Sequence, residues 1–125
     1  MSRGGITRNV VDRSVVGLGG NQFETNVINV AANATISKGT ILRRKGNKLE
    51  AATSLDSTTP FFVNPFDITN DSGSVADLSL RAIIFGPVRA DLLRLNGEFL
   101  TDEQNDFLRH SGITPIKAHD ISLTE

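Results

Sequence analysis

The chain has 125 residues, a length typical of a single domain. Hydrophobic residues make up 38% of it and there are 11 glycines, which indicates a globular protein rather than a disordered or collagen-like chain. Cysteine is absent, which excludes disulfides, thiolate metal sites and cysteine nucleophiles. No apolar run approaches the ~20 residues of a membrane span and no leader-like segment opens the sequence, so we expect a soluble, unprocessed chain without a membrane partner.

The formal net charge is −1, which gives no indication of a nucleic-acid partner. The charge is unevenly distributed, however. Residues 1–62 contain eight Lys/Arg and four Asp/Glu, a net charge of +4, whereas residues 63–125 contain five and ten, a net charge of −5. This asymmetry favours head-to-tail or layered association between copies.

The first 22 residues show neither a helical stripe nor a sustained alternation. Five glycines raise the entropic cost of ordering this stretch alone, yet the pairs Val10-Val11 and Val15-Val16 are too apolar for a solvated tail. We therefore expect residues 1–22 to be an extended N-terminal arm that becomes ordered on a partner as an added strand. The alternative is that they form the first strand of the domain itself.

Residues 23–125 are predicted to form a β-rich domain. Apolar residues of one parity predict a half-buried strand over residues 28–36, and a Lys-Gly-Asn-Lys turn predicts a hairpin over residues 40–52. A polar loop follows. Residues 61–68 then supply aromatic core material, and Pro60 and Pro65 predict an edge strand or a bend there. The clearest alternation predicts a strand over residues 76–85, with a bend at Gly86-Pro87 and a resumed strand over residues 88–92.

One helix is predicted near the C-terminus. Thr101 and Gln104 have the spacing of a capping box, and acidic residues at 102 and 103 favour the positive end of a helix dipole. Phe107 and Leu108 are expected to face the core, and Gly112 is expected to end the helix. The final dozen residues are expected to be an extended tail.

The search for chemistry gives weak candidates. The chain contains no G-x-S-x-G elbow, no P-loop and no H-E-x-x-H motif. The loop from Asp67 to Gly73 resembles a calcium loop, but its twelfth position is Leu78, where a bidentate glutamate belongs. His119-Asp120 with Ser122 offers the residue types of a triad without a preorganised geometry. We therefore predict no catalytic residues, no cofactor and no enzymatic activity.

Two charged clusters are candidate sites. Asp102, Asp106 and His110 would lie along one stripe of a helix and could hold a divalent ion, but acids at a helix start and a histidine at its end are also what the helix dipole favours. We predict no metal site there. A basic cluster surrounds the tip of the predicted hairpin and indicates a solvated turn or a contact to an acidic protein surface; it consists of Arg43, Arg44, Lys45 and Lys48.

The order of features resembles a known family. An alternating strand leads into the segment 36–42, with the sequence ISKGTIL, and a strand ends in Phe85-Gly86-Pro87-Val88. The segment 100–113 then closes with L-x-x-x-G-I. Over residues 25–116 this pattern resembles the head decoration, or capsid cement, proteins of tailed bacteriophages, the lambda-type family.

The resemblance implies a mainly β fold, a small β-tulip or barrel-like domain with one short C-terminal helix and an extended N-terminal arm. It further implies a structural protein of the virion, assembled in the host cytoplasm, that binds the outer surface of the head as homotrimers. There it would stabilise the shell against the pressure of packaged DNA. Its partners would be the major capsid protein and itself.

Two sets of contact residues are expected. In that family the arm pairs with the major capsid protein, and the arginines of this arm could contact acidic capsid groups. The expected capsid-contact residues are Arg3, Ile6, Arg8, Val10, Val11, Arg13, Val15 and Val16. Because association would enlarge a small core, apolar residues are expected near the threefold axis. The expected trimer-contact residues are Phe61, Phe62, Phe66, Phe85 and Val88.

Two alternatives remain open. Another structural protein of the same particle, in the tail or in head completion, could also use a β-domain with an exchanging arm. A small β-barrel ligand-binding or enzyme subunit is the alternative from a different class, and a deep polar pocket with titratable residues would favour it.

Overall fold

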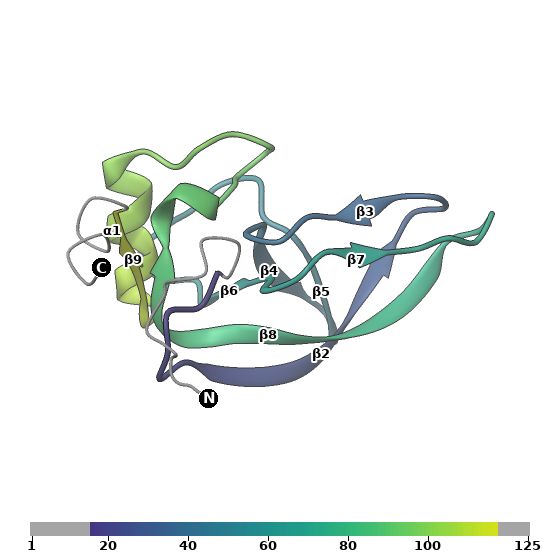
Figure 1. Ribbon diagram of the computed structural model, residues 1–125, viewed down its shortest axis with the longest axis horizontal. Helices are drawn as coiled ribbons and strands as arrows, with labels where there is room; N and C mark the ends of the chain where they lie inside the picture. The colour runs from purple at the N-terminus through teal and green to yellow at the C-terminus, as the bar shows by residue number, and fades with distance from the viewer. Residues whose placement is uncertain (1–15, 118–125) are drawn as a thin grey trace, which may run out of the picture.

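The computed structural model describes residues 16–117, which form a mainly β domain with one short helix near the C-terminus, as the sequence predicts. Figure 1 shows the helix at one end of the molecule and a small two-stranded sheet at the other. The strands are β2 (Gln22–Val30), β3 (Thr35–Ile36), β4 (Ile41–Lys45), β5 (Lys48–Ala51), β6 (Phe61–Val63), β7 (Ile68–Thr69), β8 (Ala76–Arg89) and β9 (Ile113–Ile116). The helices are the 3₁₀ turn η1 (Ala90–Leu92) and α1 (Asp102–His110).

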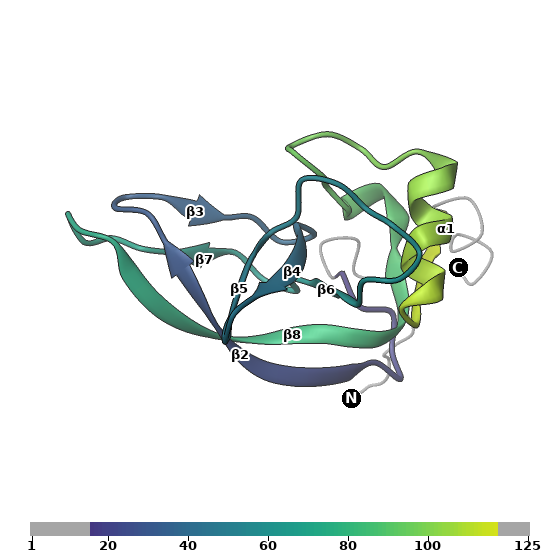
Figure 2. The same cartoon turned by 180° about the vertical axis from the view of Figure 1, so that it is seen from behind.

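Five strands close into a barrel. They follow the order β2-β5-β4-β6-β8, and β2 also pairs with β8, which completes the ring. The closing pair is antiparallel and runs from Gln22 opposite Phe85 to Val30 opposite Ala76, with a bulge between Gln22 and Phe23. Figure 2 shows β2 and β8 running side by side along the whole barrel. The two longest strands therefore lie next to each other in the barrel wall.

Two hydrophobic clusters lie on the two faces of this curved sheet. Every barrel strand contributes to the cluster inside the barrel, which contains Ile28, Val30, Leu42, Leu49, Phe62, Leu80 and Ala82. Because successive strand residues point to opposite faces, Ile41, Phe61 and Val63 project outward instead. They pack beneath the C-terminal part of the chain, where Leu93, Leu108 and Ile113 cover them. The helix thus closes one end of the domain.

The local turn chemistry forms as predicted in the hairpin and at the helix start. β4 and β5 are antiparallel, and their turn has Gly46 in the left-handed region at φ 64°. The hydroxyl of Thr101 accepts from Gln104 N at 3.2 Å, and the Gln104 side chain accepts from Thr101 N at 2.9 Å, so the capping box is complete. Gly112, at φ 94°, follows the helix end.

Two predicted strands are shorter or differently placed than expected. The strand expected over residues 28–36 ends at Val30, because Asn33 adopts a left-handed conformation with φ 54° and turns the chain into β3. Asparagine tolerates this conformation well, and periodicity alone does not reveal it. The segment expected at an edge forms β6, which lies between β4 and β8 within the barrel. Its flanking prolines shorten this strand to three residues rather than placing it at an edge.

The C-terminal part of the sheet also differs from the prediction. β8 continues through Gly86-Pro87 to Arg89, and residues 90–92 form the turn η1 instead of resuming a strand. The expected extended tail contains β9, which pairs in parallel with residues 86–89 of β8. No local signal predicts this pairing, because its two partners are 27 residues apart in sequence. Within residues 16–117, no helix has the length and apolar character needed to cross a bilayer.

Candidate docking surface

Phe66 is the central feature of an apolar surface on the outside of the barrel. Phe66 is 67% exposed, although it lies only three residues beyond the end of the buried strand β6. A shallow hollow of about 270 Å³ lies on one side of it, lined by Val16, Gly17, Gly19, Gly20, Asn21, Phe23, Pro65, Phe66 and Ile83. A second hollow of about 290 Å³ lies on the other side, lined by Asn64, Pro65, Phe66, Ile68, Ser79, Leu80 and Arg81. We call the residues that line one or the other of these two hollows the Phe66 surface.

The backbone around Phe66 is anchored on both sides. The buried Asn64 side chain donates to the carbonyl oxygens of Ile36 at 3.1 Å and Ser37 at 3.0 Å. Asp67 Oδ1 accepts from the backbone N–H of Lys38 at 2.8 Å. Since the chain is tied to the β3–β4 connection before and after Phe66, the ring is held outward on a fixed backbone.

The floor of this surface is the outer face of β2 and β8. Phe23 lies opposite Ile83, and Thr25 lies opposite Arg81. The Arg81 guanidinium stacks over the Phe23 ring, 4.9 Å from its centroid. Sequence reasoning did not select Phe23 as a site residue. The signal was its odd position in β2, where the buried Ile28 and Val30 are even.

The chain enters the described structure at the edge of this surface. Val16 is fully buried, and its carbonyl oxygen accepts from Arg89 N at 2.8 Å. Leu18 N donates to the Pro87 carbonyl at 3.1 Å. The expected contact of Val16 with a capsid is therefore wrong, because this side chain belongs to the domain core. The expected arm boundary at residue 22 is also too late, since residues 16–22 belong to the domain. The other expected capsid-contact residues lie outside the described residues.

The expected trimer contacts divide into two groups. Phe66 and Phe85 are exposed. Phe61, Phe62 and Val88 are buried in the two core clusters, so their expected role at a trimer surface is wrong. The physical reason is the closure of the barrel. Because β6 is paired with a strand on each side, its side chains alternate between the two buried core clusters. Phe66, which follows Pro65, lies beyond the end of the strand.

A separate cleft of about 590 Å³ lies beside the helix, between loop 53–55, the turn at Asn96-Gly97 and α1. Its lining is mixed, with hydroxyl, amide, carboxylate and aromatic groups, and includes Glu98, Phe99, Glu103, Gln104 and Phe107. The Arg94 guanidinium stacks on Phe99, 3.9 Å from the ring centroid. The Asn96 side chain donates to the Thr53 carbonyl at 2.9 Å and ties two walls of the cleft together.

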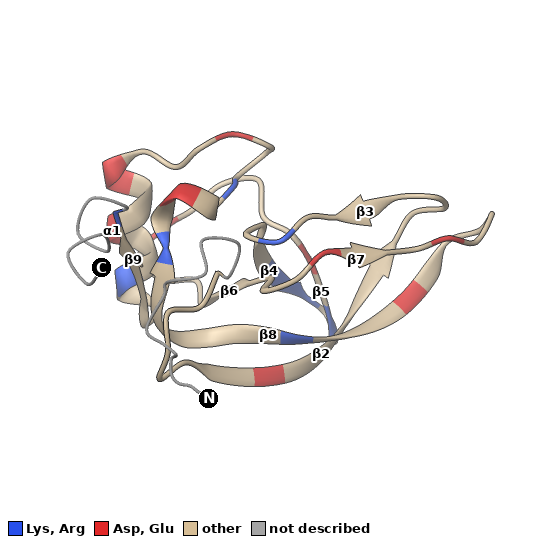
Figure 3. Cartoon of the chain, in the orientation of Figure 1, with Lys and Arg blue, Asp and Glu red and all other residues tan. Residues whose placement is uncertain are grey.

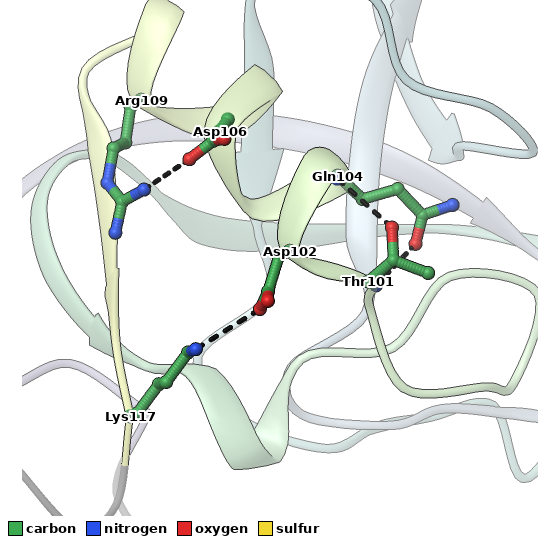
Figure 4. Close-up of polar contacts among 6 residues, drawn as sticks. All are labelled: Thr101, Asp102, Gln104, Asp106, Arg109 and Lys117. Carbon is green, nitrogen blue, oxygen red and sulfur yellow. Dashed lines mark hydrogen bonds and ion pairs between the residues drawn. The ribbon is translucent and has the colours of Figure 1, made fainter.

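The two carboxylates of the stripe formed by Asp102, Asp106 and His110 on α1 are paired with basic residues. Figure 4 shows Asp106 paired with Arg109, and Asp102 paired with Lys117 at 3.2 Å. Within residues 16–117 no group of three or more acidic, histidine or cysteine side chains is placed to hold a metal, and this covers the loop from Asp67 to Gly73. His119, Asp120 and Ser122 lie outside the described residues.

The basic residues of β4 and β5, coloured blue in Figure 3, form ion pairs with acids of their own chain. Arg44 contacts Glu24 at 3.0 Å, and Lys48 contacts Asp77 at 2.8 Å. Hydrogen bonds from Asn29 and then Lys48 lower the pKa of Asp77 below its usual value. Arg43 and Lys45 both lie near Glu50, at 3.4 and 3.7 Å. These pairs reduce the charge that the cluster presents to a partner.

No family model matches the chain, and neither a curated protein nor a solved structure matches it. The resemblance to the lambda-type decoration proteins therefore stays a prediction.

Proposed function

We propose that this protein is a structural decoration protein that binds the outer surface of a phage head as homotrimers and strengthens the shell against internal DNA pressure. The role is one of assembly rather than catalysis. The major capsid protein and other copies of the chain are its partners, and no cofactor takes part.

The observation that carries this proposal is the Phe66 surface. A large aromatic ring is held outward between two apolar hollows on a backbone anchored by Asn64 and Asp67. Contiguous apolar surface of this kind is typical of protein–protein contact sites. Rigid aromatic residues that lose little entropy on binding are suited to anchor such contacts. The sequence resemblance over residues 25–116 gives the class of assembly.

Attachment of such a small domain to a shell depends on repetition. Three copies in one trimer contact the shell at the same time, so weak individual contacts act together with a high effective concentration. Arg3 and Arg8 of the arm, which are expected capsid-contact residues, would add contacts to acidic groups of the shell. The trimer would then bridge neighbouring capsomers.

The test is co-sedimentation of the full chain with empty shells of its own virus, combined with the mass of the bound species. We expect saturable binding in multiples of three, and a reconstruction with density at threefold positions. Phe66→Ser should weaken binding by about tenfold or more. Phe99→Ser is the matched control, because Phe99 is 68% exposed and lies in the separate cleft beside α1.

Three outcomes would contradict the proposal. They are failure of the unmodified chain to bind shells, bound monomers at other positions, and equal loss of binding for both variants. The cleft beside α1 is the observation that favours the alternative, a ligand-binding or enzyme subunit, since its polar and aromatic lining suits a small molecule. Loss of function with the Phe99 variant alone would favour that alternative. Binding to tails or head vertices instead of shells would favour a tail or head-completion protein.

A further inference from the structure

The direction of the chain at Val16 limits what can fill the Phe66 surface. Residues 16–18 run antiparallel to the end of β8, with Gly17 opposite Val88 and Leu18 bonded to Pro87. The surface lies beside the middle of β8, at Ser79, Arg81 and Ile83. Read backwards from Leu18 to Val16, the chain therefore runs alongside Pro87 to Arg89, in the direction that leads away from the middle of β8. To fill its own surface, the preceding segment would have to reverse direction.

The sequence before Val16 does not favour such a reversal. Residues 6–15 contain no glycine and no proline, and the other turn-forming residue types, Asn9, Asp12 and Ser14, are separated from one another by valine or arginine. The same stretch carries five β-branched residues, which favour an extended backbone: Ile6, Thr7, Val10, Val11 and Val15. An extended apolar segment that leaves its own domain can instead reach the same surface on another copy.

We propose that residues 10–15 of one copy occupy the Phe66 surface of a neighbouring copy. This inference rests on the proposed function for the presence of that neighbour. The valines would fill the two hollows on either side of Phe66. Six extended residues span up to about 20 Å, which leaves residues 1–9 free to reach the shell.

Charge at the surface fits this occupant. Arg81 lines the second hollow, and Asp67 directly follows Phe66. Neither side chain forms an ion pair within residues 16–117. The segment brings one acid and one base, Asp12 and Arg13, so Arg81 and the neighbouring Asp67 can each meet an opposite charge. An entirely apolar or entirely basic partner would satisfy only part of this arrangement.

The absence of cysteine allows a direct test by disulfide trapping. Ser14→Cys is placed on one copy and Ser79→Cys on a second, size-tagged copy, and the two are co-expressed so that they assemble together. Ser79 is exposed and lines the second hollow. A disulfide forms only when the two Cα atoms come within about 7 Å. Asn47→Cys, on the exposed β4–β5 turn, replaces Ser79→Cys in the control.

We expect a mixed disulfide between the Ser14→Cys and Ser79→Cys copies, in solution or on shells, at least about tenfold more abundant than with the Asn47→Cys control. A chain that carries both Ser14→Cys and Ser79→Cys should form links between chains rather than within one. An intrachain disulfide would assign the surface to the chain's own segment and overturn the inference. Equal trapping at Asn47, or no trapping alone or on shells, would also overturn it.

The two proposals fail in different ways. Trapping without any binding of the unmodified chain to shells would leave the segment exchange standing and remove the role in decoration. Trimers on shells without trapping would overturn the segment exchange and leave the role in decoration standing. Phe66→Ser should abolish the mixed disulfide, because the hollows lose their shared wall, whereas Phe99→Ser should leave it unchanged.

Discussion

Gly39 packs directly against the backbone of Leu92. A Cβ atom at position 39 would lie 1.8 Å from the Leu92 carbonyl oxygen, and Gly39 has φ 85°. Its N–H donates to the Asn64 carbonyl at 2.7 Å, and its own carbonyl accepts from Arg94 N at 2.9 Å. One glycine thus joins the β3–β4 connection to Asn64 of the Phe66 surface and to the chain after η1. The position of Phe66 depends on this junction.

Gly39→Ala should therefore destabilise the domain by about 3 kcal/mol or more, because the backbone contact must open and a left-handed conformation must be adopted. Gly46→Ala is the matched control. Its φ is also positive, at 64°, but nothing lies within 4 Å of the added Cβ, so a cost of about 1 kcal/mol is expected. Urea denaturation of both variants measures the difference. Similar losses for the two would show that the contact with Leu92 is not limiting.

Two phenylalanines of one segment should respond differently to truncation. Phe62 is 5% exposed inside the barrel, with the Arg44 guanidinium over its ring, whereas Phe66 lies outside. Phe62→Ala should cost about 3–5 kcal/mol of unfolding free energy, and Phe66→Ala less than about 1 kcal/mol for the single chain. Chemical denaturation at low protein concentration checks this. A large loss at Phe66 would mean that its ring supports the fold rather than a partner.

The ion pair between Arg89 and Asp91 is the third test. Arg89 Nη2 lies 2.7 Å from Asp91 Oδ2, and the Arg89 side chain is only 2% exposed. Asp91→Ala should cost about 3 kcal/mol, because it leaves a buried guanidinium without its counter-charge. Adding Arg89→Met should restore part of the loss, since the unpaired charge is removed. Thermal or urea melts of both variants measure these changes in stability. A double variant less stable than Asp91→Ala would contradict the argument.

Acid should weaken the loop before β6 through Asp56. Its pKa is lowered from 3.8 to about 2, mainly because the backbone N–H groups of Thr58 and Thr59 donate to its carboxylate, at 2.8 and 2.7 Å. A lowered folded-state pKa means that protonation favours the unfolded chain. The contribution of Asp56 is therefore complete above about pH 5 and is lost as the pH falls toward 2.

The Asp56→Asn variant isolates this effect, because all other carboxyl groups titrate alike in both proteins. We expect the stability difference between the two proteins to narrow between pH 5 and pH 2 in denaturant melts. A difference that stays constant over that range would show that Asp56 does not have the lowered pKa. The carboxyl titration of Asp56, followed by NMR, gives the same information directly.

Local patterns in the sequence predicted the elements that are held by neighbouring residues. The β4–β5 hairpin follows from its Gly46 turn, and the start of α1 follows from the contacts between Thr101 and Gln104. The alternation in β2 and β8 correctly placed Ile28, Val30 and Leu80 in the core. Each of these features depends on residues within a few positions of one another, so spacing alone carries the information.

Which apolar residues remain on the surface depends on long-range packing that no local pattern encodes. Phe62 and Phe66 have the same side chain in one short segment, yet barrel closure covers the first and the anchors at Asn64 and Asp67 hold the second outward. The parallel pairing of β9 with β8 and the burial of Val16 likewise depend on residues far apart in the chain. Local sequence patterns are enough to predict a β-rich domain with one capped helix. The site at Phe66 was decided by long-range pairing, because the exposure of a side chain depends on what covers it and not on its neighbours in sequence.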